Sequence, residues 1–226
     1  MEKKELKQII KKFPIFSNLD EPNLSRLAEN AVLSDIPKKA IYFSEAKFLE
    51  GMHVLLSGKV KLFKLAEDGK EQTIFVFGPG EPFCLCSTFS DGKMPANLSA
   101  LEDSKVLFIS PSKFQTLIQE DPSILLNMMS VMAKRLKDAM VMIDSLSLKQ
   151  IPSRLAAYFL SQNEEGWLKL GISYRELSKI IGVTPEALSR TLKKMSKEKL
   201  IEVDGTNVRV INTERLEACR DGSYLL

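Results

Sequence analysis

Residues 173–195 contain the pattern that most constrains the fold of this chain, SYRELSKIIGVTPEALSRTLKKM. Ser173 is a natural N-cap, and Glu176 three residues later completes a capping-box pattern. Gly182 ends this first helix, and Thr184-Pro185 begins another with an N-cap followed by proline in the first turn. The segment therefore predicts two short helices joined by a tight turn, which is a helix-turn-helix.

The second predicted helix has an apolar side and a polar side. The apolar side carries Leu188, Leu192 and Met195, and the polar side carries Glu186, Ser189, Arg190, Lys193 and Lys194. Arginine can donate a bidentate pair to guanine, glutamate can accept from cytosine N4, and serine can contact a base or a phosphate. A polar face on a helix is most often only solvated. The caps, the turn and the segment that follows favour DNA binding instead.

That following segment, residues 199–211, contains two β-rich runs around Asp204-Gly205, a strong hairpin signal. A hairpin directly after a recognition helix is a wing. Residues 171–211 closely resemble the C-terminal winged helix of the CRP/FNR superfamily of bacterial transcription regulators, and the resemblance extends over nearly the whole chain. It implies a homodimer that binds a palindromic operator on double-stranded DNA and works with RNA polymerase.

The same resemblance names the residues expected at the DNA. Glu186, Ser189 and Arg190 match the E-x-x-S-R pattern of the FNR-like branch, which implies half-sites of TTGA or TTGT type. The further residues expected at the DNA are Thr184, Lys193, Ser173 and Arg175.

Between residues 32 and 109 the apolar period shifts from that of a helix toward two. The β-rich runs are residues 41–43, 54–63, 73–77 and 106–109, with turn residues between them. This pattern predicts a small antiparallel roll or barrel. The stretches LLSGKVKLFK and FVFGPGEPF resemble the cyclic-nucleotide-binding-type β-roll. Ala40 and Ala46 stand where that pattern often carries glycine, so the turn geometry there is an open question.

A long helix is predicted from Asp121-Pro122 to about Lys149, because nothing in between breaks it. Its apolar positions alternate four and three residues apart and form a heptad seam of Leu125, Met129, Met132, Leu136, Ala139, Ile143 and Leu146. Such a seam predicts a dimer. A neighbouring stripe of Leu126, Ala133 and Met140 is expected to face the roll. Pro152 disfavours helical geometry at Ile151, so residues 150–153 are expected to form a hinge.

The predicted fold class is therefore α+β. A β-roll sensor domain is expected in residues 1–110, a dimerisation helix in 111–149, and a winged helix-turn-helix DNA-binding domain in 150–226. A net charge of only +3 means that any DNA-binding surface is a local patch. No run approaches the roughly 20 apolar residues of a membrane span, so we expect a cytoplasmic protein with no membrane partner. One histidine, no Walker loop and no GxGxxG motif argue against an enzyme.

The resemblance places a small-effector pocket between residues 80 and 100. Relatives that bind cyclic AMP carry a glycine-glutamate and an arginine-serine pair there, whereas this chain has Cys84-Leu85 and Pro95-Ala96. A cyclic nucleotide would leave its charge unpaired, so we expect another effector. The expected pocket residues are Phe83, Cys84, Leu85, Cys86, Pro95, Ala96, Met128 and Met132.

The first 83 residues contain no cysteine, which excludes the N-terminal iron–sulfur cluster of other relatives. What remains resembles the Dnr/HcpR-like branch, which senses nitric oxide or redox signals and in some members binds haem. We expect no metal site. His53 is a weak candidate for a haem ligand, since a lone histidine in a strand is more often a packing residue.

Cys84 and Cys86 would share one face of a strand, either as a redox-reactive site or as buried packing thiols. The alternative function for the whole chain is a β-roll ligand-binding or interaction protein with a vestigial helix-turn-helix. That alternative predicts no discrimination between a palindromic site and random DNA.

Overall fold

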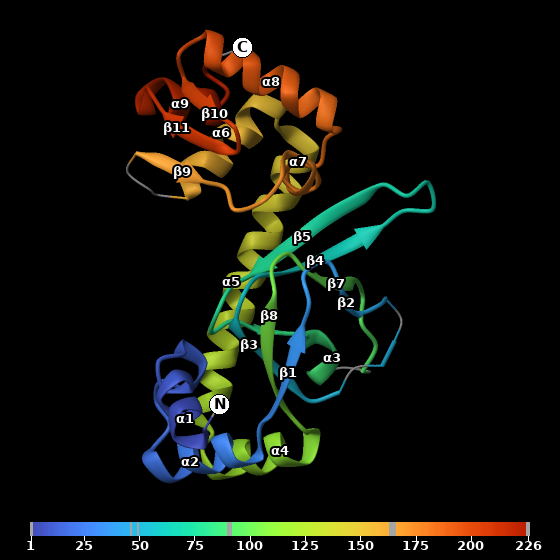
Figure 1. The fold of residues 1–226 in the computed structure, drawn as a ribbon, viewed down its shortest axis with the longest axis vertical. Coiled ribbons are helices and arrows are strands. Elements are labelled where there is room, and N and C mark those ends of the chain that lie inside the picture. The colour runs from blue at the N-terminus through green and yellow to red at the C-terminus, as the bar shows by residue number, and fades with distance from the viewer. Residues whose placement is uncertain (1, 46, 49, 90–91, 163–165, 225–226) are drawn as a thin grey trace. The chain divides into compact units, whose positions relative to one another are not determined.

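The computed structural model describes residues 2–45, 47–48, 50–89, 92–162 and 166–224, with the side chains of Cys86 and Ser87 outside the description. The chain divides into two compact units, Met1–Asp138 and Ala139–Leu226 (Figure 1). Helix α5, Ser123–Leu148, contributes residues to both units.

The first unit combines short helices with two antiparallel sheets. Its further helical segments are α1 (Lys3–Ile10), η1 (Pro14–Phe16), α2 (Glu21–Asn30), α3 (Leu85–Phe89) and α4 (Pro111–Glu120). Its strands are β1 (Val32–Ile36), β2 (Ile41–Phe43), β3 (Met52–Ser57), β4 (Val60–Leu65), β5 (Glu71–Phe77), β6 (Pro82–Phe83), β7 (Asn97–Ala100) and β8 (Ser104–Ile109). The strand orders are β1-β8-β3-β6 and β2-β7-β4-β5. The predicted antiparallel roll is therefore confirmed.

Strand β3 is buried on both faces and separates two cores. Val54 and its neighbours on one face pack with the helices, including Phe114 and Met128. Leu55 points to the other face and packs between the two sheets with Phe77 and Leu98. Alternation of side chains along a strand produces this division.

Helix α5 meets the first unit through Ile124 and Met128, which are buried, and through Arg135, whose guanidinium lies 4.3 Å from the centroid of the Phe77 ring. The prediction that Leu126, Ala133 and Met140 face the roll is wrong, because these three side chains are exposed. The stripe that packs on the roll lies beside the predicted one and includes an arginine. Because Arg135 is charged, the apolar periodicity of the sequence does not identify it as a packing position.

The prediction that Cys84 and Cys86 lie on one strand is also wrong. Strand β6 ends at Phe83, Cys84 adopts a left-handed conformation with φ of 64°, and α3 begins at Leu85. A non-glycine residue with positive φ is uncommon, and the local sequence Phe-Cys-Leu-Cys does not predict a left-handed conformation at Cys84. Ala46 lies outside the described residues. Ala40 donates its N–H to the carbonyl of Pro37 over 2.9 Å, in a turn whose left-handed residue is Lys39.

The second unit is a small helical domain with one antiparallel sheet. Its remaining elements are α6 (Ile151–Ser161), β9 (Trp167–Lys169), α7 (Tyr174–Ile181), α8 (Pro185–Lys197), β10 (Ile201–Asp204), β11 (Asn207–Val210) and α9 (Thr213–Arg220). The strand order is β10-β11-β9. Leu155 of α6, Leu177 of α7, Leu188 and Leu192 of α8 and Leu216 of α9 share its core. A helix-turn-helix followed by a two-stranded wing is confirmed.

The predicted hinge at residues 150–153 is wrong for three of its four residues, because Ile151, Pro152 and Ser153 lie in α6. Helix α5 ends at Leu148, Gln150 is extended with ψ of 161°, and α6 begins at Ile151. The expectation that Ile151 is non-helical is therefore wrong. Pro152 lies in the first turn of α6, where its missing N–H removes no intrahelical hydrogen bond. Within the part of the chain that the structure describes, no helix is long and apolar enough to cross a bilayer.

Candidate nucleic-acid interface

The turn between α7 and α8 is built by local capping. The Ser173 hydroxyl accepts the N–H of Glu176 at 3.2 Å, and the Thr184 hydroxyl accepts the N–H of Ala187 at 3.2 Å. Between the helices, Gly182 has φ of 75° and donates its N–H to the carbonyl of Ser178 at 2.9 Å. Only glycine adopts this left-handed conformation without steric cost. The turn between the two helices therefore rests on residues that the sequence identifies locally.

Helix α8 divides sharply into a buried and an exposed side. Leu188, Leu192 and Met195 are at most 3% exposed. Glu186, Ser189, Arg190, Lys193 and Lys194 are all exposed, as are Thr184, Ser173 and Arg175. The first five lie together on α8, with Thr184 at its N-cap, whereas Ser173 and Arg175 lie at the start of α7. The exposed side of α8 thus presents both hydrogen-bond donors and an acceptor.

Glu186 stays ionised at neutral pH. Its pKa is lowered by hydrogen bonds from its own backbone N–H and from the Thr184 hydroxyl, and further by the positive charge of Arg190. A carboxylate in the first turn of a helix also opposes the helix dipole favourably. Glu186 therefore offers a fixed acceptor one helical turn from the Arg190 donor, the combination needed to contact cytosine and guanine edges.

The wing is tied to α7 by a side chain that sequence reasoning missed. The strands of the wing pair from Ile201 with Val210 to Asp204 with Asn207, and the turn passes through Gly205. The Tyr174 phenol donates a 2.6 Å hydrogen bond to the carbonyl of Gly205. No sequence signal announces this bond, because its acceptor is a backbone atom 31 residues away.

Arg154 is a second residue that the sequence did not identify. Its guanidinium donates to the carbonyls of Leu146 and Lys149 at 2.9 Å each, and to that of Ile181 at 3.3 Å. The last carbonyls of a helix have no intrahelical partner. One arginine therefore caps the end of α5 and the end of α7 at once, joining the long helix to the helix-turn-helix.

The far end of α8 is held by the C-terminal segment. Arg215 donates to the carbonyl of Glu198 at 3.1 Å, directly after α8. The Tyr224 hydroxyl donates to the Glu198 carboxylate at 3.2 Å, and the Arg215 guanidinium lies 4.7 Å from the centroid of the Tyr224 ring. Both ends of α8 are thus fixed by side-chain hydrogen bonds.

The predicted effector residues fall into different environments of the first unit. Phe83 and Cys84 are buried between the two sheets, and Leu85 and Met128 are buried in the core beneath the helices. Ala96 is also buried, whereas Pro95 and Met132 are exposed and the side chain of Cys86 lies outside the description. Phe83 and Cys84 therefore share one core and Leu85 and Met128 another, so the seven residues with described side chains do not line a single pocket.

A charged contact joins α5 to the roll beside these residues. Arg135 donates to the Glu81 carboxylate at 2.8 Å, and the other oxygen of Glu81 accepts the N–H of Gly78 at 2.7 Å. The Arg135 guanidinium also lies 4.3 Å from the centroid of the Phe77 ring and 5.2 Å from that of the Phe75 ring, so Arg135 contacts one carboxylate and two aromatic rings. Sequence reasoning missed this residue.

His53 is a core residue. It is 2% exposed, packs against Phe83 and Phe108, and has ring nitrogens 3.2 Å from the Tyr42 hydroxyl and 3.2 Å from the Glu50 carbonyl. Since the carbonyl only accepts, Nε2 carries the proton and Nδ1 accepts from Tyr42. Burial lowers the pKa of His53 to about 4.

This arrangement does not fit haem ligation through His53, because neither ring nitrogen is available to iron. Among the described residues, no cluster of three or more His, Cys, Asp and Glu residues could hold a metal ion.

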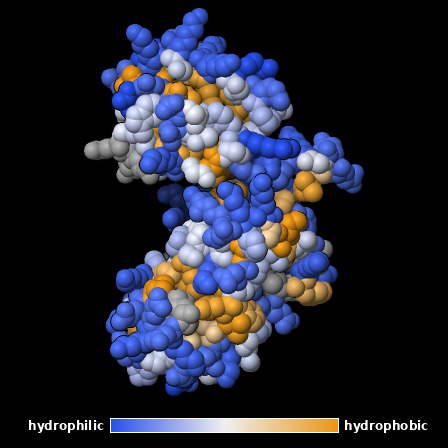
Figure 2. Space-filling model, in the orientation of Figure 1, coloured by the Kyte–Doolittle hydropathy of each residue, from blue (hydrophilic) through white to orange (hydrophobic). Residues whose placement is uncertain are grey.

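The seam positions of α5 are largely uncovered. Met129, Met132, Leu136 and Ile143 are 43–66% exposed, and Leu125, Ala139 and Leu146 are half-buried. Leu126, Met140 and Val141 add further exposed apolar side chains to the same helix. Elsewhere, most of the face shown in Figure 2 is hydrophilic, with apolar side chains gathered in patches. We call the exposed side chains of Leu126, Met129, Met132, Leu136, Met140 and Ile143 the α5 stripe.

Comparison with known proteins assigns both halves of the chain. Residues 34–121 match the cyclic nucleotide-binding domain family, and residues 153–219 match the Crp-like helix-turn-helix domain family. The chain is 29% identical over 182 residues to the cyclic AMP receptor protein of Thermus thermophilus, covering 80% of this chain and 84% of the relative. It is also 29% identical over 209 residues to the probable transcriptional regulator flp of Lacticaseibacillus casei, covering 90% and 94%.

Solved structures show the same fold. FixK2 from Bradyrhizobium japonicum superposes with a TM-score of 0.75 at 22% identity, covering 84% of this chain and 96% of that chain. A CooA variant from Carboxydothermus hydrogenoformans superposes with a TM-score of 0.73 at 24% identity, covering 84% and 87%.

Proposed function

The chain belongs to the CRP/FNR family of DNA-binding transcription regulators, and from this premise we propose that it acts as a homodimer that reads an inverted repeat under the control of a small effector. Its family is one of regulators rather than enzymes. In this proposal, residues 1–110 form the sensor, 111–149 the dimerisation helix and 150–226 the DNA-binding domain. The observation that carries the proposal is the exposed polar side of α8, held at both ends by hydrogen bonds.

We assign sequence readout to Glu186, Ser189 and Arg190. Arg190 would donate to guanine and Glu186 would accept from cytosine, in half-sites of TTGA or TTGT type. Thr184, Lys193, Ser173 and Arg175 would contact phosphates and fix the register. Phosphate contacts orient a protein on DNA without selecting a sequence, so losing them lowers affinity for all sequences alike.

The α5 stripe supports the homodimer. Met129, Met132, Leu136 and Ile143 of this stripe belong to the predicted heptad seam. The stripe has no covering element within the described residues of this chain, and burying it against a second copy is favourable. Two recognition helices related by a twofold axis would then lie about 34 Å apart and reach successive major-groove faces. RNA polymerase is the proposed partner at the promoter.

Several relatives carry cyclic AMP in their names. In this chain, the carboxylate and arginine that would hold such a ligand are replaced by Leu85 and Pro95, and the Arg135 guanidinium is engaged by Glu81. Without that carboxylate and that arginine, cyclic AMP would lack its two charged partners. We propose a different effector, of the nitric oxide or redox kind sensed by the Dnr/HcpR-like branch. Absorption spectra of the purified protein before and after addition of haem or nitric oxide test this, and tight calorimetric binding of cyclic AMP would contradict it.

The DNA-binding proposal is tested by gel shift over a range of salt concentrations. Specific binding to a palindromic fragment should survive salt that removes binding to random DNA, because only base contacts distinguish the two. Equal loss on both fragments would favour a β-roll interaction protein with a vestigial helix-turn-helix.

A further inference from the structure

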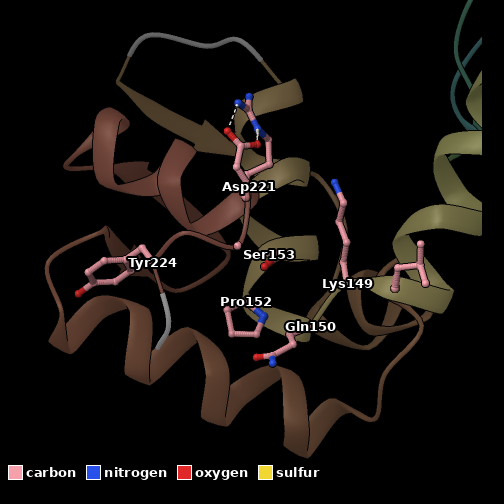
Figure 3. A pocket seen from close by; sticks show the side chains of 9 residues that line it. Lys149, Gln150, Pro152, Ser153, Asp221 and Tyr224 are labelled. Carbon is pink, nitrogen blue, oxygen red and sulfur yellow. Dashed lines mark hydrogen bonds and ion pairs between the residues drawn. The ribbon is translucent and has the colours of Figure 1, made fainter.

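A cavity of about 420 Å³ lies within the second unit, between the end of α5, the start of α6 and the segment after α9 (Figure 3). Its polar lining residues are Lys149, Gln150, Ser153, Arg220, Asp221 and Tyr224. Cavities of this size hold small organic ligands in other proteins. None of the residues lining this cavity belongs to the exposed side of α8 or to the predicted effector residues.

The N-terminus of α6 opens at this cavity with free backbone donors. The first bond of the helix runs from the N–H of Arg154 to the carbonyl of Gln150, and Gln150 makes no side-chain cap. The N–H groups of Ile151 and Ser153 have no hydrogen-bond partner within the described chain. α6 is 11 residues long, so its N-terminus carries the partial positive charge that attracts anions.

Ser153 supplies a second, independent indication. It is only 9% exposed, it lines the cavity, and its hydroxyl has no hydrogen-bond partner among the residues that the structure describes (Figure 3). Among the described residues, the enclosed side-chain oxygens without a partner are those of Thr73 and Ser123, so the oxygen of Ser153 is open to the cavity and can donate to a molecule bound there. Ser153 therefore offers a donor that the protein itself does not use.

The charge balance at the cavity is positive. Arg220 binds Asp221 through two hydrogen bonds of 2.7 and 2.9 Å, so these two lining charges offset each other. Lys149 is the second lining cation: its ammonium lies 3.6 Å from the carboxylate of Asp144, which does not line the cavity, and its positive charge also helps to lower the pKa of Asp221. The side chain of Lys149 is about one-third exposed and can turn toward a ligand.

From these observations we propose that the cavity binds a small phosphate-bearing molecule. A phosphate has enough acceptor oxygens to take the Ser153 hydroxyl, the free N–H groups of α6 and the Lys149 ammonium together, whereas a carboxylate has two oxygens for the same donors. Bound there, it joins the residue that follows α5 to the first turn of α6.

Calorimetric titration of the full chain with inorganic phosphate, at constant ionic strength in chloride, tests this. We expect one phosphate per chain, and we expect Lys149→Gln to weaken binding about tenfold, the effect of losing one charge-assisted hydrogen bond. Ser153→Ala should weaken binding severalfold while leaving the unfolding midpoint in chloride unchanged or higher, since it removes an unpartnered hydroxyl.

Two control variants locate the bound phosphate. Lys137→Gln alters an exposed lysine of α5, and Arg190→Ala alters the DNA-facing side of α8; both should bind phosphate like the parent protein. Unchanged binding in Lys149→Gln and Ser153→Ala, or loss of binding in Arg190→Ala, would overturn the assignment to this cavity. Acetate binding as tightly as phosphate would overturn the ligand class.

Discussion

The phenol of Tyr174 donates a 2.6 Å hydrogen bond to the carbonyl of Gly205, and this bond connects the first turn of α7 to the tip of the wing. The bond therefore holds the tip of the wing against the start of the helix-turn-helix. Removal of the hydroxyl alone, in Tyr174→Phe, keeps the ring and deletes the bond.

We expect Tyr174→Phe to lower the free energy of unfolding by about 0.5–1.5 kcal/mol, the usual net contribution of one hydrogen bond. Urea unfolding followed by circular dichroism measures it. Tyr158→Phe is the matched control, because the Tyr158 hydroxyl makes no hydrogen bond among the described residues. Equal stability changes in the two variants would mean that the Tyr174 bond does not hold the wing.

Arg190→Ala should reduce affinity for the cognate site by about 1–3 kcal/mol and relax selection at one guanine. Fluorescence anisotropy with cognate and substituted duplexes measures both effects. Lys197→Ala removes another exposed cation of the same helix and should weaken cognate and random DNA alike. The same uniform loss in Arg190→Ala would show that Arg190 contacts only phosphate.

Leu136→Lys should convert the dimer to a monomer at micromolar concentration. Leu136 is 66% exposed in the middle of the α5 stripe. In a twofold dimer the two introduced lysines would lie near each other and repel. Sedimentation velocity measures the change, and Ser130→Lys, an exposed position outside the stripe, is the control. A Leu136→Lys protein that still sediments as a dimer would exclude the stripe as the interface.

Acid should destabilise the first unit through His53. Burial lowers the pKa of His53 from 6.5 to about 4. Below pH 6.5, His53 is therefore protonated in the unfolded chain but stays neutral in the folded protein until the pH approaches 4. The contribution of neutral His53 to the free energy of unfolding is fully present above pH 6.5. It is lost as the pH falls toward 4 and amounts to roughly 3 kcal/mol in total. His53→Gln should show a shallower decline of unfolding free energy over that range.

His53 is the only histidine, so its proton magnetic resonance also reports the pKa directly. A midpoint near 6.5 in the folded protein would contradict the buried, hydrogen-bonded position.

The sequence predicted the helix-turn-helix because its signals are local. Ser173, Gly182, Thr184 and the Asp204-Gly205 turn each act within a few residues of their position. The long helix α5 was predicted for the same reason, because its signals lie within one segment, whereas the pairing of its seam with a second copy stays a prediction.

The contacts that the sequence did not reveal join residues that lie far apart in the chain. Arg154, Tyr174 and Arg215 donate to backbone carbonyls, which carry no side-chain identity, and Arg135 finds Glu81 across 54 residues. The strand predicted at Cys84 failed because only the tertiary structure imposes its left-handed conformation.

Selection of binding sites from a random duplex library tests directly whether a dimer of this chain reads an inverted repeat through α8. We expect enrichment of two TTGA- or TTGT-type half-sites in inverted orientation, with centres about 10 base pairs apart, and loss of that enrichment in Arg190→Ala. Sequences with no shared inverted repeat, or the same enrichment in Arg190→Ala, would contradict it.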